Sequence, residues 1–405
     1  MRRIKFTALV IAMVGNLCPT PPMLKFLRIA NQQIIPRHAR TWMSTAGIEK
    51  SHSAILFPGQ GSQYVGMGKD LYTRYPHSAK QVFDEADEAL GGNLSKLKLT
   101  ENAQPAILTT SIAILRVLEH ELDFDVAKAC TYALGHSLGE YTALVATKSI
   151  SLTDAVKLVR LRGEAMTRAV ADRQGQTAMS ALVVRGDHLP ELEFSMDEIR
   201  ASLPPGELVE LANINSTFQV VISGTSRGVD EASRILQRKG FAARAVDLPV
   251  SAPFHCSLMQ EAANAMEEAL KTVEIKKPIV DIVSNVTAKP VSPIALCPSS
   301  PTVDLWYTHS MSLQYSNPEE IASLLVQQVT STVEWNRSIN YCKKQDIDEF
   351  LCFGPGKVLA NLLKKEYPMD KIRSITTADD IDGLYDELKL KIDNSVSRTQ
   401  ENSTK

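Results

Sequence analysis

The sequence YALGHSLGE, residues 132–140, contains the pattern Gly-x-Ser-x-Gly with Ser137 at its centre. This pattern predicts a strand that ends in a sharp turn and continues directly as a helix, with the serine at the turn in a strained backbone conformation. The Ser137 hydroxyl would then project into an open site. The N–H of Leu138, at the start of the helix, could face an oxyanion on an acyl group carried by the serine. A glycine–serine turn without chemistry is the alternative for the pattern alone.

Apolar patterns on both sides of this stretch alternate between strand and helix. Strands are predicted where short apolar runs meet turn residues, and helices where apolar residues recur every three or four positions. The predicted strands are 54–57, 132–134, 281–285 and 349–353, and the predicted helices are 69–90, 103–120, 153–170, 258–273, 319–329 and 335–344. This alternation indicates an α/β fold with a parallel sheet between two layers of helices, and we expect an α/β-hydrolase-like core.

Residues 175–248 follow a different order: strand, helix, strand, strand, helix, strand. This is the order of a ferredoxin-like α+β unit, and we interpret it as a subdomain inserted into the core. The predicted organisation is a leader at 1–48, a core built from 49–174 and 249–393, the insertion at 175–248, and a disordered polar tail at 394–405. Within the core, the Pro-, Ser- and Thr-rich segment 292–317 indicates a surface loop.

The first 48 residues contain seven basic residues and no acidic one. An acid-free, arginine-containing leader is typical of a mitochondrial transit peptide, so we expect the mitochondrial matrix as location. A secretory signal is the alternative, because residues 8–14 form a short apolar run after basic residues; this run is too short to span a membrane. Removing seven of the 44 basic residues leaves 37 against 46 acidic residues, and the resulting net charge of −9 argues against a nucleic-acid partner.

The six cysteines indicate neither a metal site nor a disulfide framework. None forms a C-x-x-C pair, and no cysteine–histidine group has the spacing of a zinc site. In a chain of 405 residues they are expected to be buried or idle thiols in a reducing compartment.

A general base for Ser137 is expected among the eight histidines, and His255 is the best candidate. It lies in a proline-bracketed loop between the insertion and the core, and loops held by rigid scaffolds are where catalytic groups concentrate. The alternative is a structural histidine. His136 neighbours the serine but would point away from it at the turn, and the others lie in the leader or in polar surroundings.

Arg162 falls on the wrong face of its helix for an ordinary charged residue. With about 100° per residue, it lies in the middle of the apolar face of 153–170, opposite the other charged side chains. A buried guanidinium does not lose its proton and needs an anionic partner. A rise of about 1.5 Å per residue also brings Arg162 back to the level of Ser137 if the two helices run antiparallel. The alternative is a structural ion pair with a nearby carboxylate.

Together these residues belong to a set of ordered motifs. They are FPGQGSQ at 57–63, GHSLGE at 135–140, LRG at 161–163, VSAPFH at 250–255, SNVT at 284–287 and GPGKVL at 354–359. In this order the motifs resemble those of malonyl-CoA:acyl carrier protein transacylases, over about residues 54–365. The leader is similar to that of a mitochondrial member of the family.

The resemblance implies a ping-pong acyl transfer that supplies fatty acid synthesis. Ser137 would carry the malonyl group, His255 would be its base, and Arg162 would hold the free malonyl carboxylate. The partners would be malonyl-CoA and acyl carrier protein, with no metal, no bound cofactor, no nucleic acid, no membrane span and a monomeric enzyme.

The resemblance also implies roles for three backbone groups. The N–H groups of Gln60 and Leu138 would form the oxyanion hole, and the carbonyl of Gln328 would orient the histidine. The chain departs from the family pattern at Phe218, where glycine is expected, at residues 331–332, where Ser-Thr replaces Asn-Pro, and at the extra segment 292–317. None of these departures touches the implied chemistry.

Two other classes of function remain open from the sequence. A serine thioesterase or lipase of the α/β-hydrolase type uses the same turn, but in that class an acid follows the serine before the histidine, and no buried arginine is required. A scaffold that has kept the fold without activity is the non-enzymatic alternative. The intact residues Ser137, His255 and Arg162 count against it.

The leader generates a direct test. A fluorescent reporter fused behind residues 1–48 is expected to accumulate in mitochondria, because an acid-free basic segment is typical of matrix import. Microscopy of the fusion checks this. Secretion of the reporter would favour the signal-peptide alternative, and a cytosolic signal would remove the support for either.

Overall fold

The computed structural model describes residues 52–92, 100–173, 175–290 and 318–387, all within the compact unit formed by residues 46–405. The predicted leader 1–48, the segment 292–317 and the tail 394–405 lie outside the described residues. In the described part of the chain, no helix combines the length and the apolar content needed to cross a lipid bilayer.

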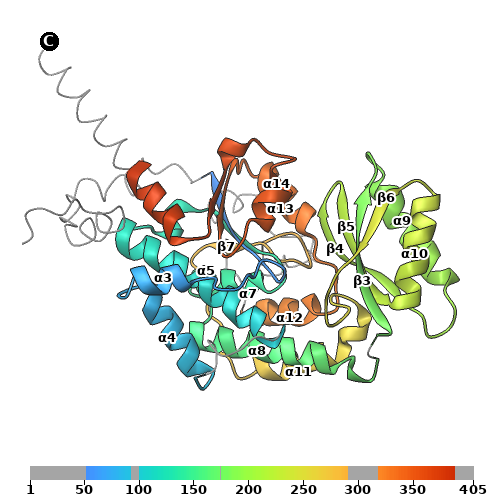
Figure 1. Ribbon diagram of the computed structural model, residues 1–405, viewed down its shortest axis with the longest axis horizontal. Coiled ribbons are helices and arrows are strands. Elements are labelled where there is room, and N and C mark those ends of the chain that lie inside the picture. The colour runs from blue at the N-terminus through green and yellow to red at the C-terminus, as the bar shows by residue number, and fades with distance from the viewer. Residues whose placement is uncertain (1–51, 93–99, 174, 291–317, 388–405) are drawn as a thin grey trace, which may run out of the picture. The chain divides into compact units, whose positions relative to one another are not determined.

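A five-stranded parallel sheet lies at the centre of the core (Figure 1). Its strand order is β7-β2-β1-β8-β9, with bounds Asp281–Ile282, Tyr132–Gly135, Ser53–Phe57, Glu349–Phe353 and Ile372–Ile375. Every residue of β1 and β2 is buried, as expected for parallel strands covered on both faces. The short apolar runs in the sequence are therefore central strands of this sheet.

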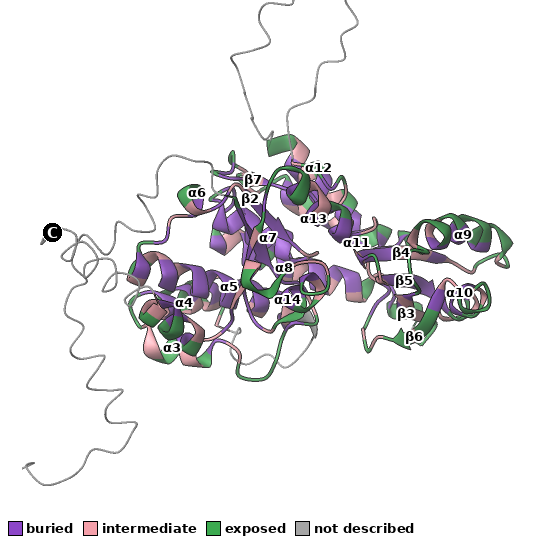
Figure 2. Ribbon diagram, turned by 90° about the horizontal axis from the view of Figure 1, so that it is seen from above, coloured by how far each residue is buried: buried purple, intermediate pink, exposed green. Residues whose placement is uncertain are grey.

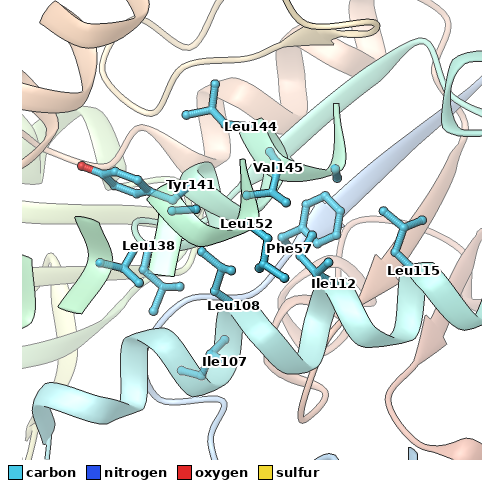
Figure 3. Close-up of a cluster of buried hydrophobic side chains, with 14 of the residues drawn as sticks. Phe57, Ile107, Leu108, Ile112, Leu115, Leu138, Tyr141, Leu144, Val145 and Leu152 are labelled. Carbon is cyan, nitrogen blue, oxygen red and sulfur yellow. The ribbon is translucent and has the colours of Figure 1, made fainter. Parts of the chain in front are cut away.

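Helices cover both faces of this sheet, as predicted. Because successive side chains of a strand point to opposite faces, Ile55 and Phe57 join one apolar cluster while Ala54 and Leu56 join another. Figure 3 shows Phe57 packed among side chains from 107–115 and from 138–152. The helices of the core are α3 (Lys69–Arg74), α4 (Ala79–Ala89), α5 (Thr100–Leu122), α6 (Val126–Ala129), α7 (Gly139–Ala146), α8 (Leu152–Arg168), α11 (Gln260–Leu270), α12 (Pro318–Gln328), α13 (Trp335–Lys344) and α14 (Val358–Leu363).

A second, antiparallel sheet follows residue 175. It has the order β4-β5-β3-β6, and its strands are β3 (Thr177–Val184), β4 (Val209–Ser216), β5 (Gln219–Thr225) and β6 (Ala242–Asp247). The helices α9 (Leu189–Ser202) and α10 (Ser226–Arg238) pack on one face of it through a separate apolar cluster, and their outer surfaces are exposed (Figure 2). The chain is thus mixed α/β, with a parallel core sheet and a separate antiparallel sheet.

The other face of the second sheet holds the loop that leads back to the core. Met179, Ala212 and Val221 form a small cluster there, and Val250 and Phe254 of the loop pack against it. The second sheet is also tied to the segment after α12, because Val333 donates its N–H to the carbonyl of Ala212 at 2.8 Å. The loop that ends in His255 is therefore supported by a sheet on one side.

Several predicted elements need correction. The single helix predicted over 69–90 is wrong: α3 ends at Arg74 and α4 begins at Ala79. Pro76 explains the break, because a proline disfavours helical geometry at the residue before it, and Tyr75 has φ −121° and ψ 71°. The strand predicted over 281–285 covers two residues only, and β9 and the helical residues 378–387 have no predicted counterpart.

The turn at Ser137 depends on two close backbone approaches. Ser137 has φ +54°, in the left-handed region that non-glycine residues rarely adopt. A Cβ on Gly135 would lie 1.8 Å from the carbonyl carbon of Gly139, and a Cβ on Gly139 would lie 2.3 Å from the carbonyl oxygen of Phe57. Strand and helix therefore meet at a distance that only glycine permits, which confirms the strained turn predicted from the pattern.

This contact gives a stability test. Gly135→Ala is expected to lower the free energy of unfolding by about 2 kcal/mol or more, because the backbone must move to admit the methyl group. Gly383→Ala is the matched control, since a Cβ there meets no atom within 4 Å. Because Gly383 lies in a helix, this substitution should leave the free energy of unfolding unchanged or raise it by up to ~1 kcal/mol. Urea unfolding measures both. An unchanged unfolding midpoint for Gly135→Ala would contradict the close approach.

Candidate active site

Ser137 is held at the turn by a side chain from a distant segment. Its N–H donates to Oδ1 of Asn285 at 2.7 Å, and Nδ2 of Asn285 donates to the carbonyl of Gly135 at 2.7 Å. Asn285 follows β7, the strand next to β2. Its carboxamide therefore binds the backbone on both sides of the turn, at Gly135 and at Ser137. The sequence contained this residue in the SNVT motif, but nothing in the motif predicted its contacts.

His255 lies within hydrogen-bond distance of the serine. Its Nε2 is 2.7 Å from Oγ of Ser137, and its Nδ1 is 2.9 Å from the carbonyl oxygen of Gln328. Because a carbonyl only accepts, Nδ1 carries the hydrogen, and the Nε2 lone pair faces the serine hydroxyl. His255 also has φ +59°, so both members of this pair lie in strained backbone conformations.

The environment of His255 keeps its imidazole neutral. The residue is only 4 % exposed, and burial together with the nearby Arg162 cation lowers its pKa to about 3, against the opposing effect of the bond to Gln328. Both causes disfavour the imidazolium form. A neutral imidazole is ready to accept the serine proton at any pH near neutrality.

Arg162 reaches the same point from α8. The side chain is 2 % exposed. Its Nη2 donates to Oγ of Ser137 at 3.0 Å and to Oε1 of Gln328 at 3.0 Å. Its Nη1 donates to Oε1 of Gln104 at 2.9 Å. All three acceptors are neutral, and Nε has no partner in the described part of the chain. The predicted position beside Ser137 is confirmed, whereas Gln104 has no counterpart among the predicted residues. Among the described residues no carboxylate is hydrogen-bonded to the guanidinium, so it has no direct counter-ion beside the nucleophile.

The two predicted oxyanion donors lie in the turn and in the loop beside it. Gly59 touches the turn so closely that a Cβ on it would lie 2.3 Å from the carbonyl oxygen of His136. Among the residues that the structure describes, the N–H groups of Gln60 and Leu138 donate to no acceptor. Free N–H groups at the nucleophile are what an oxyanion hole requires.

The remaining polar candidates lie away from the serine hydroxyl. His136 points away from it, as predicted: its Nε2 is 2.8 Å from Oδ1 of Asn215 in β4, and its ring packs on Trp335. Across the described ranges, no three His, Cys, Asp or Glu side chains are grouped to hold a metal ion. The described cysteines, at positions 130, 256, 342 and 352, are free and buried.

The chain is similar to known enzymes over most of its length. Residues 55–324 match the family model of the acyl transferase domain. The malonyl CoA-acyl carrier protein transacylase of Bacillus subtilis is 39% identical over 85% of this chain and 100% of its own length. The chain belongs to the malonyl CoA-acyl carrier protein transacylase family. The Escherichia coli transacylase of the same name is 36% identical over 77% of this chain and 92% of its own length.

Solved structures of transacylases share the fold. The acyl-carrier-protein-S-malonyltransferase from Bartonella henselae superimposes with a TM-score of 0.70 at 39% identity, covering 83% of this chain and 99% of its own. A malonyl-transacylase in complex with a type II PKS acyl-carrier protein gives a TM-score of 0.66 at 31% identity, over 82% of this chain and 97% of its own. The transacylase fold therefore covers both sheets.

The neutral state of His255 can be measured directly. By NMR of histidine-labelled protein, we expect a His255 pKa well below the usual histidine range, and a higher value in Arg162→Ala, because removing the cation removes one of the causes that disfavour protonation. The resonance is assigned by its loss in His255→Asn. A wild-type value near 6.5 would contradict a lowering of this pKa by burial and Arg162.

Proposed function

We propose that this transacylase transfers the malonyl group of malonyl-CoA to the phosphopantetheine thiol of acyl carrier protein through an ester on Ser137. The observation that carries the proposal is the buried Arg162 guanidinium, which touches the nucleophile and has only neutral acceptors. A buried cation with no carboxylate bonded to it is suited to bind an anion that the substrate brings. A malonyl thioester does so, because its free carboxylate lies two carbons from the reacting carbonyl.

The first half of the reaction forms the acyl-enzyme. His255 takes the proton from Oγ of Ser137 as the oxygen attacks the thioester carbonyl. The N–H groups of Gln60 and Leu138 stabilise the resulting oxyanion. When the tetrahedral intermediate collapses, the carbon–sulfur bond breaks and the CoA thiolate takes the proton from His255.

The second half reverses these steps with a different thiol. The phosphopantetheine thiol gives its proton to His255 and attacks the malonyl ester on Ser137. Collapse breaks the carbon–oxygen bond, and the serine oxygen takes the proton back. The carbonyl of Gln328 keeps Nδ1 of His255 protonated throughout, so the same nitrogen, Nε2, moves the proton in both directions. None of these steps requires a cofactor beyond the substrate.

A serine thioesterase or lipase is less well supported. In that class a carboxylate orients the catalytic histidine, whereas Nδ1 of His255 faces the backbone carbonyl of Gln328. A buried arginine at the nucleophile also serves no purpose in the hydrolysis of a neutral ester.

Further features are part of the proposal. We infer an α/β-hydrolase-like core from residues 49–174 and 249–393 and a ferredoxin-like insertion at 175–248; the strand order β4-β5-β3-β6 with two helices on one face supports the latter. We also propose a monomeric enzyme in the mitochondrial matrix. The acid-free leader supports the location, with 1–48 as the transit peptide.

The selectivity for a carboxylated acyl group tests the function. Arg162→Ala is expected to lower kcat/KM for malonyl-CoA by at least about tenfold to a hundredfold, since a charge-assisted hydrogen bond contributes about 1.5–3 kcal/mol. Transfer from acetyl-CoA should be spared or rise, because an acetyl group has no carboxylate to bind the guanidinium in the wild type. Both rates are measured with acyl carrier protein as acceptor.

Ser137→Ala is the control, and mass spectrometry should find no acyl adduct on it. Equal losses for the two esters in Arg162→Ala would make Arg162 a structural residue and would remove the main support for malonyl selectivity.

A further inference from the structure

Glu140 places a second charge in the interior, one helical turn beyond Ser137. Its side chain is 3 % exposed, and its Oε2 accepts from Nε2 of Gln328 at 2.6 Å and from the N–H of Asn285 at 3.4 Å. Burial raises the pKa of Glu140 to about 7, while the bonds to Gln328 and Asn285 and the Arg162 cation oppose that rise. Its hydrogen-bond partners are neutral, so it resembles Arg162 in being a buried charge without a direct counter-ion.

The carboxamide of Gln328 lies between the two charges. Its Nε2 donates to Glu140 at 2.6 Å, and its Oε1 accepts from Nη2 of Arg162 at 3.0 Å. An amide has one donor end and one acceptor end, and an ionised carboxylate only accepts. Glu140 therefore selects the orientation in which the carbonyl end of Gln328 faces the guanidinium. A second bond, from Nε2 to the carbonyl of Ser137 at 3.0 Å, favours the same orientation.

Through the Gln328 carboxamide, Glu140 balances the charge of Arg162 without contacting the guanidinium directly. A direct pair between Glu140 and Arg162 would occupy the guanidinium edge that a substrate carboxylate needs, and each substrate would have to break that pair. With one amide in between, attraction persists at reduced strength, and Nε of Arg162 is left without a partner in the described part of the chain. Gln328 also holds His255 through its backbone carbonyl, so its placement affects both the cation and the base.

We propose that Glu140 is a positioning and specificity-determining residue: through the carboxamide of Gln328, its carboxylate balances and orients the Arg162 guanidinium while leaving it open to the carboxylate of the acyl group. This inference rests on the proposed malonyl transfer. It assigns to Glu140 an effect on which acyl group is accepted, although the residue touches neither Ser137 Oγ nor Arg162.

The test compares acyl selectivity in full-length variants at pH 8, above the pKa of Glu140. Glu140→Gln keeps the shape and can still accept from Gln328, but it removes the charge. A malonyl carboxylate then meets no repulsion from residue 140, and an acetyl group leaves Arg162 with no balancing charge at all. The ratio of kcat/KM for malonyl-CoA to that for acetyl-CoA is expected to rise by about tenfold.

Two further variants separate charge from shape. Glu140→Asp keeps the charge, so the malonyl-to-acetyl ratio should stay near the wild-type value even if both rates fall. Glu164→Gln removes a carboxylate from α8, two residues after Arg162, where it pairs with Arg160; both rates should be unchanged. A shift in Glu140→Asp equal to that in Glu140→Gln would overturn the role of charge, and an unchanged ratio in Glu140→Gln would reduce Glu140 to a structural residue.

Failure of this inference is distinguishable from failure of the proposed function. If the wild type forms no malonyl ester on Ser137, the function itself is wrong, whatever the ratio in the variants. If Glu140→Gln is too unstable for kinetic measurements, its stability is measured by thermal unfolding instead. Glu140→Gln/Arg162→Gln should then be more stable than Glu140→Gln alone, because no unbalanced charge remains. A double variant that is no more stable would overturn the charge balance.

Discussion

The close approach of β2 and α7 is the constraint on which the site depends. Gly135 and Gly139 meet where no side chain fits, and this contact allows Ser137 to adopt φ +54°. The left-handed turn puts the serine hydroxyl, the N–H of Leu138 and the start of α7 together at the end of strand β2. Asn285, which follows the neighbouring strand β7, then fixes the turn with one donor and one acceptor. The strain is offset by bonds that only the folded sheet can supply.

Gln328 connects the parts that the turn brings together. Its backbone carbonyl sets the tautomer of His255, and its side chain contacts Arg162, Glu140 and the carbonyl of Ser137. One residue at the end of α12 thereby couples the base, the cation and the nucleophile. In a buried site such coupling matters, since a polar group that loses its partner there is costly to the folded state.

The second sheet has a role in the site although none of the predicted site residues lies in it. Its open face packs against the loop that carries His255, and Asn215 of β4 binds His136, the residue before the nucleophile. Two departures from the family pattern, at Phe218 and at residues 331–332, lie at its margins. Phe218, in the turn between β4 and β5, packs against Lys365, and Thr332 donates its hydroxyl to the carbonyl of Leu211. These contacts join the insertion to the core without involving the reacting groups.

The sequence by itself determined the turn at Ser137, the α/β class and the burial of Arg162, because local chemistry fixes all three. Glycine spacing forces the turn, buried parallel strands require continuous apolar runs, and the 3.6-residue period puts residue 162 on the apolar face. It also marked His255 through the prolines around it. Only the tertiary structure decided how Asn285, Gln104 and Glu140 act. Their hydrogen-bond partners lie far away in the sequence, and amides and carboxylates show no periodic pattern from which these partners could be predicted.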